Sequence, residues 1–293
     1  MSRVVVECVP NFSEGRDQAT LDLIEAALKG VTLLGREADG DHNRSVFTFA
    51  GRPEMVMEAA IQAVGVAAAH IDLNQQQGGH PRIGAADVVP FVPVSGISLE
   101  SCVELAWKAG EEIWHRYGVP VYFYEAAARV AGRERLENIR RGQFEGLRDE
   151  LVLSAERAPD LGAGRLHPTA GATVIGARKF LIAYNINLAC GDVAVASAIA
   201  KKIRGSSGGL ACVKALGVLL KSRGLAQVSM NLTDFEVTSV DSVYAAVKRE
   251  AAALGTSILE TELIGFIPRA AVGRQAFAPE QILENALDAK LKT

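Results

Sequence analysis

The chain has 293 residues, about twice the common domain size of roughly 100–150 residues, so two domains or one large domain are expected. Hydrophobic residues make up 49% of the chain and charged residues 22%, which excludes a wholly disordered or fibrous protein. The formal net charge of −3 provides no global basic field that would hold nucleic acid or an anionic membrane.

Strand-like and helix-like segments alternate along the first 124 residues. The patterns predict strands at residues 4–9, 45–50, 86–94 and 119–124, and helices at residues 20–29, 53–71 and 98–117. Ser98 is the predicted N-cap of the third helix, and Gly118 ends it. Pro90 and Pro93 predict that the strand at 86–94 lies at a sheet edge or carries a bulge.

The second half repeats this alternation after a break. Residues 129–157 are the most charged part of the chain and are predicted to form exposed helix, and a loop-rich segment follows at 159–172. Strands are then predicted at 179–188, 227–232 and 257–267, and helices at 192–204, at 238–255 and from Pro279 onward.

This repeated order predicts an α/β (α+β) protein with two similar subdomains, residues 1–178 and 179–293. Each is expected to be a mixed β-sheet with helices packed on one face, with a ligand groove between the two. The first strand is not followed by G-x-G-x-x-G, which argues against a dinucleotide-binding fold.

Several features indicate a cytoplasmic protein. Glu7 and Glu14 interrupt the N-terminal segment before any long apolar run, so a signal peptide is not expected. No segment reaches the roughly 18 apolar residues of a membrane helix. The four cysteines are far apart and form no C-x-x-C pair, so reduced thiols fit better than a zinc ribbon or a disulfide framework. We expect no nucleic-acid partner and no membrane partner.

The first candidate for chemistry is His80. It follows Gly78 and Gly79 and precedes Pro81, so a flexible and then a stiffened backbone would hold the imidazole at the mouth of a cleft. An unperturbed pKa near about 6.5 suits proton transfer. The alternative is a surface turn whose histidine has no function.

The second candidate is the segment D-G-D-H-N-R at residues 39–44. One interpretation is a manganese, iron or zinc site made by Asp39, Asp41 and His42, with His80 and Asp87 as further ligands. Another is substrate binding, in which Arg44 pairs with a carboxylate and Asp39 orients an imidazole. A polar turn that leads into a strand explains the same residues.

Two glycine-rich segments complete the candidates. The loop at 159–172, followed by Arg178, lies at the predicted domain junction, where it is either a small-ligand site or a linker. The segment 201–209 combines Lys201, Lys202 and Arg204 with glycines. It is either an anion site on backbone N–H groups or a helix C-terminus with its glycine stop.

Five motifs in chain order resemble the formiminotransferase family. They are VECVPNFSEGR at the start, NRSVFTF at 43–49, HPRIGAADVVPFVP at 80–93, GARKFLIAYNINL at 176–188 and AQVSMNLTDFE at 226–236. The resemblance implies two α/β subdomains, a homodimer, and transfer of a formimino group from N-formiminoglutamate to N5 of tetrahydrofolate, without a metal. Gly79 stands where members of the family usually have Glu.

The same resemblance assigns roles to individual residues. His80 is the predicted catalytic base, and Asp39 is the predicted aspartate that holds the imidazole tautomer. Both substrates carry carboxylates, so Arg44 and Arg82 are predicted substrate contacts, together with Asn11. The predicted folate contacts are Gly162, Ala163, Gly164, Arg165, Leu166, His167, Pro168, Thr169, Ala170, Gly171 and Arg178.

Three other functions remain open at this point. Formyl transfer between formylglutamate and tetrahydrofolate uses the same co-substrate. A metal-dependent amidohydrolase would use Asp39, Asp41, His42 and His80. A folate-binding module without activity would keep the fold alone.

Overall fold

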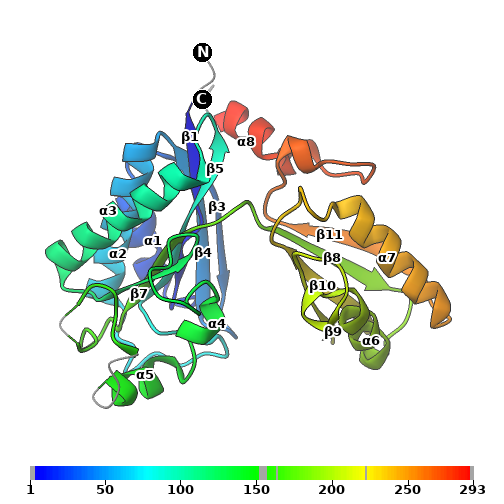
Figure 1. The fold of residues 1–293 in the computed structure, drawn as a ribbon, viewed down its shortest axis with the longest axis horizontal. Helices are drawn as coiled ribbons and strands as arrows, with labels where there is room; N and C mark the ends of the chain where they lie inside the picture. The colour runs from blue at the N-terminus through cyan, green and yellow to red at the C-terminus, as the bar shows by residue number, and fades with distance from the viewer. Residues whose placement is uncertain (1–3, 152–156, 163, 222, 291–293) are drawn as a thin grey trace. The chain divides into compact units, whose positions relative to one another are not determined.

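The computed structural model describes residues 4–151, 157–162, 164–221 and 223–290. The chain divides into two compact units, Met1–Arg178 and Lys179–Thr293 (Figure 1). Each unit has its own sheet, seven-stranded in the first and four-stranded in the second. The predicted α/β class with two units is confirmed.

The first sheet is mixed. Its strands are β1 (Val5–Cys8), β2 (Asn11–Phe12), β3 (Thr32–Asp39), β4 (Arg44–Gly51), β5 (Ala86–Ser95), β6 (Val121–Glu125) and β7 (Thr173–Ala177). The order is β1-β4-β2-β5-β7-β6, with β3 paired to β4 and β1 also paired to β5. β7 runs parallel to both β5 and β6, and the other pairs are antiparallel.

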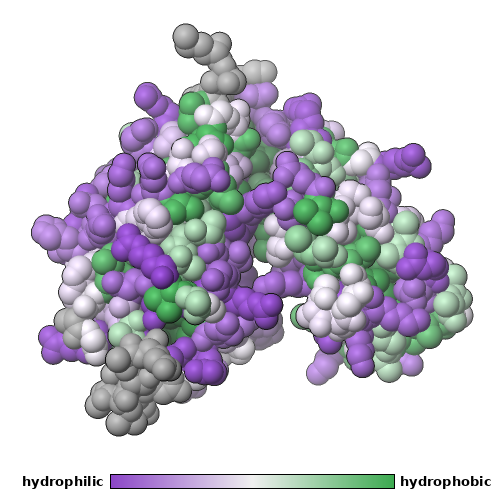
Figure 2. Space-filling model, in the orientation of Figure 1, coloured by the Kyte–Doolittle hydropathy of each residue, from purple (hydrophilic) through white to green (hydrophobic). Residues whose placement is uncertain are grey.

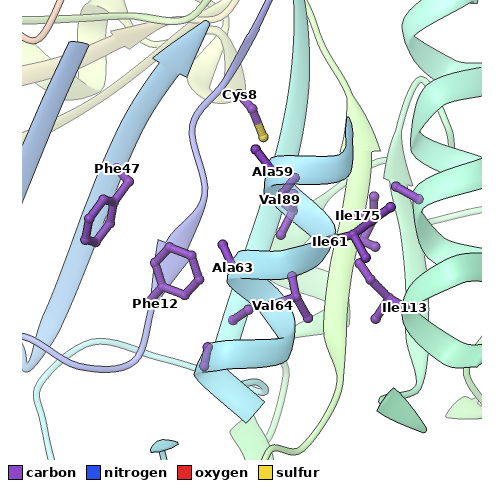
Figure 3. Packing of buried hydrophobic residues seen from close by; sticks show 14 of the residues in the cluster. Cys8, Phe12, Phe47, Ala59, Ile61, Ala63, Val64, Val89, Ile113 and Ile175 are labelled. Carbon is purple, nitrogen blue, oxygen red and sulfur yellow. The ribbon is translucent and has the colours of Figure 1, made fainter. Parts of the chain in front are cut away.

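Three helices cover one face of this sheet: α1 (Gln18–Ala27), α2 (Pro53–His70) and α3 (Leu99–Tyr117) (Figure 1). As predicted, the Ser98 hydroxyl caps α3 by accepting from Ser101 N, and Gly118 ends the helix with φ 64°. Ile61 of α2 is fully buried near Val89 and Ile175 of the strands, and burial of this kind stabilises by about 1.5–3 kcal/mol per side chain (Figure 3). This packing makes the sheet a rigid base for the loops at its ends.

Strand β5 lies inside the sheet, so of the two predicted alternatives, a sheet edge or a bulge, the edge is excluded. β5 pairs with β2 at Val88 and with β1 from Phe91 onward, which places Pro90 opposite the break between these two short strands. No ladder donor is needed there, and the missing N–H of proline costs nothing. The predicted bulge is present, because the register with β1 shifts between Val5 and Val6.

The charged segment after β6 is less helical than predicted. Only α4 (Leu136–Ile139) and α5 (Gln143–Leu151) form within its described part. Gly142, between the two helices, and Gln143, the first residue of α5, have φ values of 82° and 58°, which breaks any continuous helix. Ile139 and Leu147 nevertheless pack on the second face of the sheet with Tyr122 and Tyr124, so this segment is a cover and not a solvated helix.

The second sheet is antiparallel throughout, which differs from the mixed sheet expected. Its strands are β8 (Ile182–Leu188), β9 (Val213–Leu220), β10 (Leu225–Leu232) and β11 (Ile258–Ile264), in the order β11-β8-β10-β9. The helices of this unit are α6 (Val193–Ile203), α7 (Val240–Ala253) and α8 (Leu283–Lys290). Short 3-10 turns occur at Gly205–Ser207, Arg269–Ala271 and Pro279–Gln281.

Alternation along β8 separates the two faces of this second sheet. Tyr184 and Ile186 are buried on one face, and Asn185 and Asn187 point to the other. Gly217 of β9 lies so close to α6 that a Cβ atom would come within 2.4 Å of Ser197 N. Hydrophilic and hydrophobic side chains are mixed on the displayed surface of each unit (Figure 2). Among the residues that the structure describes, no helix has the length and apolar character needed to cross a membrane.

Candidate functional site

Two loops of the first unit are joined to each other by their backbones. The turn between β3 and β4 contributes Asp41 O and His42 O, which accept from Gly79 N at 3.3 Å and His80 N at 3.4 Å. A Cβ atom on Gly78 would lie 2.2 Å from His42 O, so this close approach requires glycine. The two sequence candidates, residues 39–44 and the loop around His80, therefore form one site.

Asn43 fastens the turn to its surroundings. Its side-chain oxygen accepts from Gly15 N at 2.9 Å, and its side-chain nitrogen donates to Gln77 O at 3.0 Å. The backbone oxygen of Asn43 accepts from Gln76 Nε2. Asn43 has φ 49°, in the left-handed region that asparagine tolerates. The turn is thus held by two separate segments, at Gly15 and at residues 76–77.

Asp39 binds His42 and not His80. Asp39 Oδ1 accepts from the backbone N–H groups of Asp41 and His42, each at 2.9 Å, and Asp39 Oδ2 lies 2.8 Å from His42 Nδ1. These hydrogen bonds, with that of the His42 backbone first, lower the pKa of Asp39. The predicted orienting role of Asp39 is therefore directed at a different imidazole.

His80 lies in a partly buried and positively charged environment. Burial is the main cause that lowers its pKa to about 4, and the charges of Arg44 and Arg140 lower it further. Asp87 opposes these effects, and the charge of His42 adds to them. His80 is therefore uncharged near neutral pH.

Asp87 and Arg140 form a buried ion pair beside this imidazole. Asp87, at the start of β5, is 1% exposed and accepts from Ile83 N at 2.7 Å and from Gly84 N at 3.3 Å. Its second oxygen accepts from Arg140 Nη2. Arg44 is also partly buried, and burial and the charge of Arg140 lower its pKa. The carboxylates of Asp87, Asp39 and Glu37 act on Arg44 in the opposite direction. Guanidinium groups of this kind can bind a carboxylate of a ligand at two points.

Arg140 and the pairing of Asp87 were missed by the sequence analysis. Arg140 follows α4, in the charged segment that was expected to be exposed. It is 53 residues away from Asp87 in the chain, and a single sequence carries no signal for that contact.

Arg82 is bound within the unit. Its side chain is 9% exposed and forms a two-point ion pair with Glu145 of α5, at 3.0 and 2.9 Å. Its Nε donates to Gln76 Oε1 at 2.6 Å. This geometry connects α5 to the His80 loop, and a substrate contact by Arg82 stays a prediction.

The first part of the predicted folate loop is exposed, and its second part is packed against the unit. Ala163 lies outside the described residues, Gly164 and Arg165 are exposed, and Gly162 has φ 150°. From His167 onward the chain packs tightly: Leu73 N donates to Thr169 O, and Ala85 N donates to Ala170 O, both at 2.9 Å. Asn74 Nδ2 donates to Pro168 O at 3.0 Å, and Leu166 packs against the hydrophobic core.

The end of this loop is ordered by a hydrogen bond within it and lies against the segment before Asp87. His167 Nδ1 accepts from Ala170 N at 3.0 Å, which leaves its proton on Nε2. Gly171, with φ 70°, lies against Ile83, where a Cβ atom would come within 2.1 Å of Ile83 O.

Asn11 and Arg178 lie at other strands of the same sheet. Asn11 Nδ2 donates to Val9 O at 3.1 Å, so part of its amide is used locally. Arg178 follows β7 and lies near Glu7 and Tyr124: its charge lowers the pKa of both, although burial raises these values to about 7 and about 12. The predicted site residues run from Asn11 to Arg178, so all of them belong to the first unit.

The described residues contain no group of three or more His, Cys, Asp or Glu side chains arranged to hold a metal ion. Asp39, Asp41 and His42 share one turn, but the Asp39 carboxylate is already used by two backbone N–H groups and by the His42 ring.

Comparisons with known proteins agree over nearly the whole chain. The N-terminal subdomain of the formiminotransferase domain matches residues 5–178, and the formiminotransferase domain matches residues 183–279. The chain is 45% identical to glutamate formimidoyltransferase of Streptococcus pyogenes serotype M1, over 92% of this chain and 90% of that protein. It is 41% identical to glutamate formimidoyltransferase of Thermoplasma acidophilum, over 92% and 89%.

Longer relatives also match. The chain is 44% identical to formimidoyltransferase-cyclodeaminase of Sus scrofa, over 90% of this chain and 50% of that protein. The chain thus spans half the length of that relative. The two family matches together cover most of both units, and the chain belongs to the formiminotransferase family.

Proposed function

We propose that this protein is a glutamate formimidoyltransferase that acts in histidine degradation. It moves the formimino group from N-formimino-L-glutamate to N5 of tetrahydrofolate and yields 5-formiminotetrahydrofolate and glutamate. Two relatives with this name align over about nine-tenths of both chains, which supports the assignment. The observation that carries it is an uncharged His80 beside two guanidinium groups.

The geometry suits two requirements of this reaction, a site for a donor carboxylate and a base for the N5 proton. The donor is a dicarboxylate, and the guanidinium groups of Arg44 and Arg140, which both act on His80, bind a donor carboxylate. N5 of the folate attacks the amidine carbon and becomes positively charged as the bond forms. His80, uncharged at neutral pH, accepts the N5 proton.

Tetrahydrofolate is the co-substrate in this proposal. Its predicted contacts are Arg178 and the loop from Gly162 to Gly171, with Asn11 and Arg82 as further predicted substrate contacts. The protein acts as a cytoplasmic homodimer on small molecules, as the family resemblance implies, and it needs no metal.

A direct assay tests the function. Purified protein is given tetrahydrofolate with either formiminoglutamate or formylglutamate, and the folate product is followed by absorbance. We expect product with formiminoglutamate, at a rate that excess chelator leaves unchanged. Product with formylglutamate alone would establish formyl transfer, and hydrolysis that chelator abolishes and a divalent metal restores would establish an amidohydrolase.

A further inference from the structure

We infer that His42, positioned by Asp39, is a second catalytic imidazole, which donates a proton to the glutamate nitrogen as it departs. This inference rests on the proposed transfer reaction. It gives His42 a role that the family resemblance did not assign, and it directs the expected orienting role of Asp39 to His42 and not to His80.

The hydrogen bonds of Asp39 fix the orientation of the His42 ring. Oδ1 is occupied by two backbone N–H groups of the same turn, so the carboxylate cannot rotate freely, and Oδ2 faces His42 Nδ1 at 2.8 Å. An ionised carboxylate in this place accepts a hydrogen bond from Nδ1 and so keeps a proton on that atom. His42 Nε2 is then the atom that exchanges protons.

The two imidazoles lie on joined loops in opposite electrostatic settings. The His80 backbone donates to His42 O, and a Cβ atom on Gly79 would lie 3.8 Å from His42 Cδ2. His80 faces Arg44, Arg140 and Asp87, and the two cations disfavour its charged form. His42 lies against the Asp39 carboxylate, with Nδ1 2.8 Å from Oδ2. One imidazole thus stands beside two guanidinium groups and the other beside a carboxylate, an arrangement that suits the first to act as the base and the second as the acid.

The division matches the two proton movements of the transfer. When the bond from N5 to the amidine carbon forms, the electron pair of the C=N bond moves onto the terminal amidine nitrogen, and His80 takes the N5 proton. When the bond from carbon to the glutamate nitrogen breaks, that pair returns to re-form C=N, and His42 gives its Nε2 proton to the leaving nitrogen. Solvent then carries the proton from His80 back to His42, so no other reactant is needed.

The test compares variants of the full chain in the assay described above. His42→Asn places an amide nitrogen near the position of Nδ1, so it keeps the hydrogen bond to Asp39 but cannot transfer a proton. We expect kcat to fall by about 10²–10⁴ with an unchanged melting temperature. His115→Asn, on the exposed surface of α3, is the matched control and is expected to keep the wild-type rate.

Chemical rescue separates an acid from a base and from a structural role. The His42 side chain is 59% exposed, so added imidazole can reach the space left by His42→Ala. If His42 is the acid, the rescued rate follows the concentration of imidazolium and rises as the pH falls from 8 toward 6. A rescued rate that follows neutral imidazole, or no loss of kcat in His42→Asn, would overturn the inference.

The Asp39→Asn variant tests whether Asp39 positions the His42 ring. It removes the carboxylate that holds the Nδ1 proton of His42, so we expect kcat to fall while KM and the melting temperature stay unchanged. An unchanged kcat would exclude this role for Asp39. Failure of the proposed function itself is distinguishable, because the wild-type protein would then transfer no formimino group.

Discussion

At the scale of single residues, the surroundings of His80 decide how the reaction depends on pH. Burial and two guanidinium groups lower the pKa of His80 to about 4, so the free protein keeps an uncharged imidazole well below neutral pH. When a donor carboxylate binds Arg44 and Arg140, their effect on the ring is reduced, and the pKa of His80 rises in the complex.

This difference predicts two separate acid limbs. The acid limb of kcat/KM reports the free protein and is expected near pH 4, whereas the acid limb of kcat reports the complex and is expected at higher pH. Steady-state rates from pH 4 to 8 provide the measurement. Coincident limbs would show that the donor carboxylates bind elsewhere.

Replacement of the imidazole tests its role directly. His80→Ala is expected to lower kcat by about 10²–10⁴ and to preserve folate affinity, since a proton acceptor contributes mainly in the transition state. Folate binding measured by fluorescence titration accompanies the rate. If kcat stays near the wild-type value while folate affinity collapses, His80 is a binding residue.

Arg140 is the residue whose role came from the structure alone. Arg140→Ala should raise KM for formiminoglutamate by about 10- to 100-fold, because a hydrogen bond to a charged group contributes about 1.5–3 kcal/mol. Arg141→Ala, an exposed neighbour, is the control. An unchanged KM for the donor would remove Arg140 from the carboxylate site.

At the scale of elements, Arg82 connects α5 to the His80 loop through its two-point ion pair with Glu145. Arg82→Ala leaves Glu145 and Gln76 without this partner and is expected to lower the free energy of unfolding by about 1–3 kcal/mol. Urea denaturation gives the value. A raised KM with unchanged unfolding would instead support the substrate contact predicted from the sequence.

The sequence predicts elements well where the signal is local. The Ser98 cap, the Gly118 stop and the long helices follow from a few neighbouring residues, and the structure contains them. β3 was missed because Gly35, Arg36 and Glu37 interrupt its apolar pattern, and its place is fixed by pairing with β4. The same limit applies to the site: the loops that carry Asp39 and His80 could be identified, but which imidazole Asp39 binds depends on the shape of a turn.

At the scale of the whole molecule, a buried carboxyl in the first sheet affects stability. Glu7 of β1 is 2% exposed, and burial raises its pKa to about 7 against the opposing charge of Arg178. A raised pKa in the folded state means that Glu7 contributes stability which is fully present below about pH 4.5 and is lost as the pH rises through about 7.

Glu7→Gln removes this titration. The wild-type protein should lose unfolding free energy between pH 5 and 8, and the variant should lose less over the same range. Denaturant melts at several pH values compare the two. Parallel curves for the two proteins would show that Glu7 does not titrate in this window.

The guanidinium groups beside His80 also act beyond contact distance. The chain as a whole carries a net charge of −3, but Arg44 and Arg140 bring positive charge to the place where the donor carboxylate is proposed to bind. Added salt screens the field of these charges over about 8–10 Å, so the rate of donor capture, and with it kcat/KM, is expected to fall as ionic strength rises. Once the donor is bound, bulk ions no longer screen its contacts with the protein, and kcat should change little over the same range of salt.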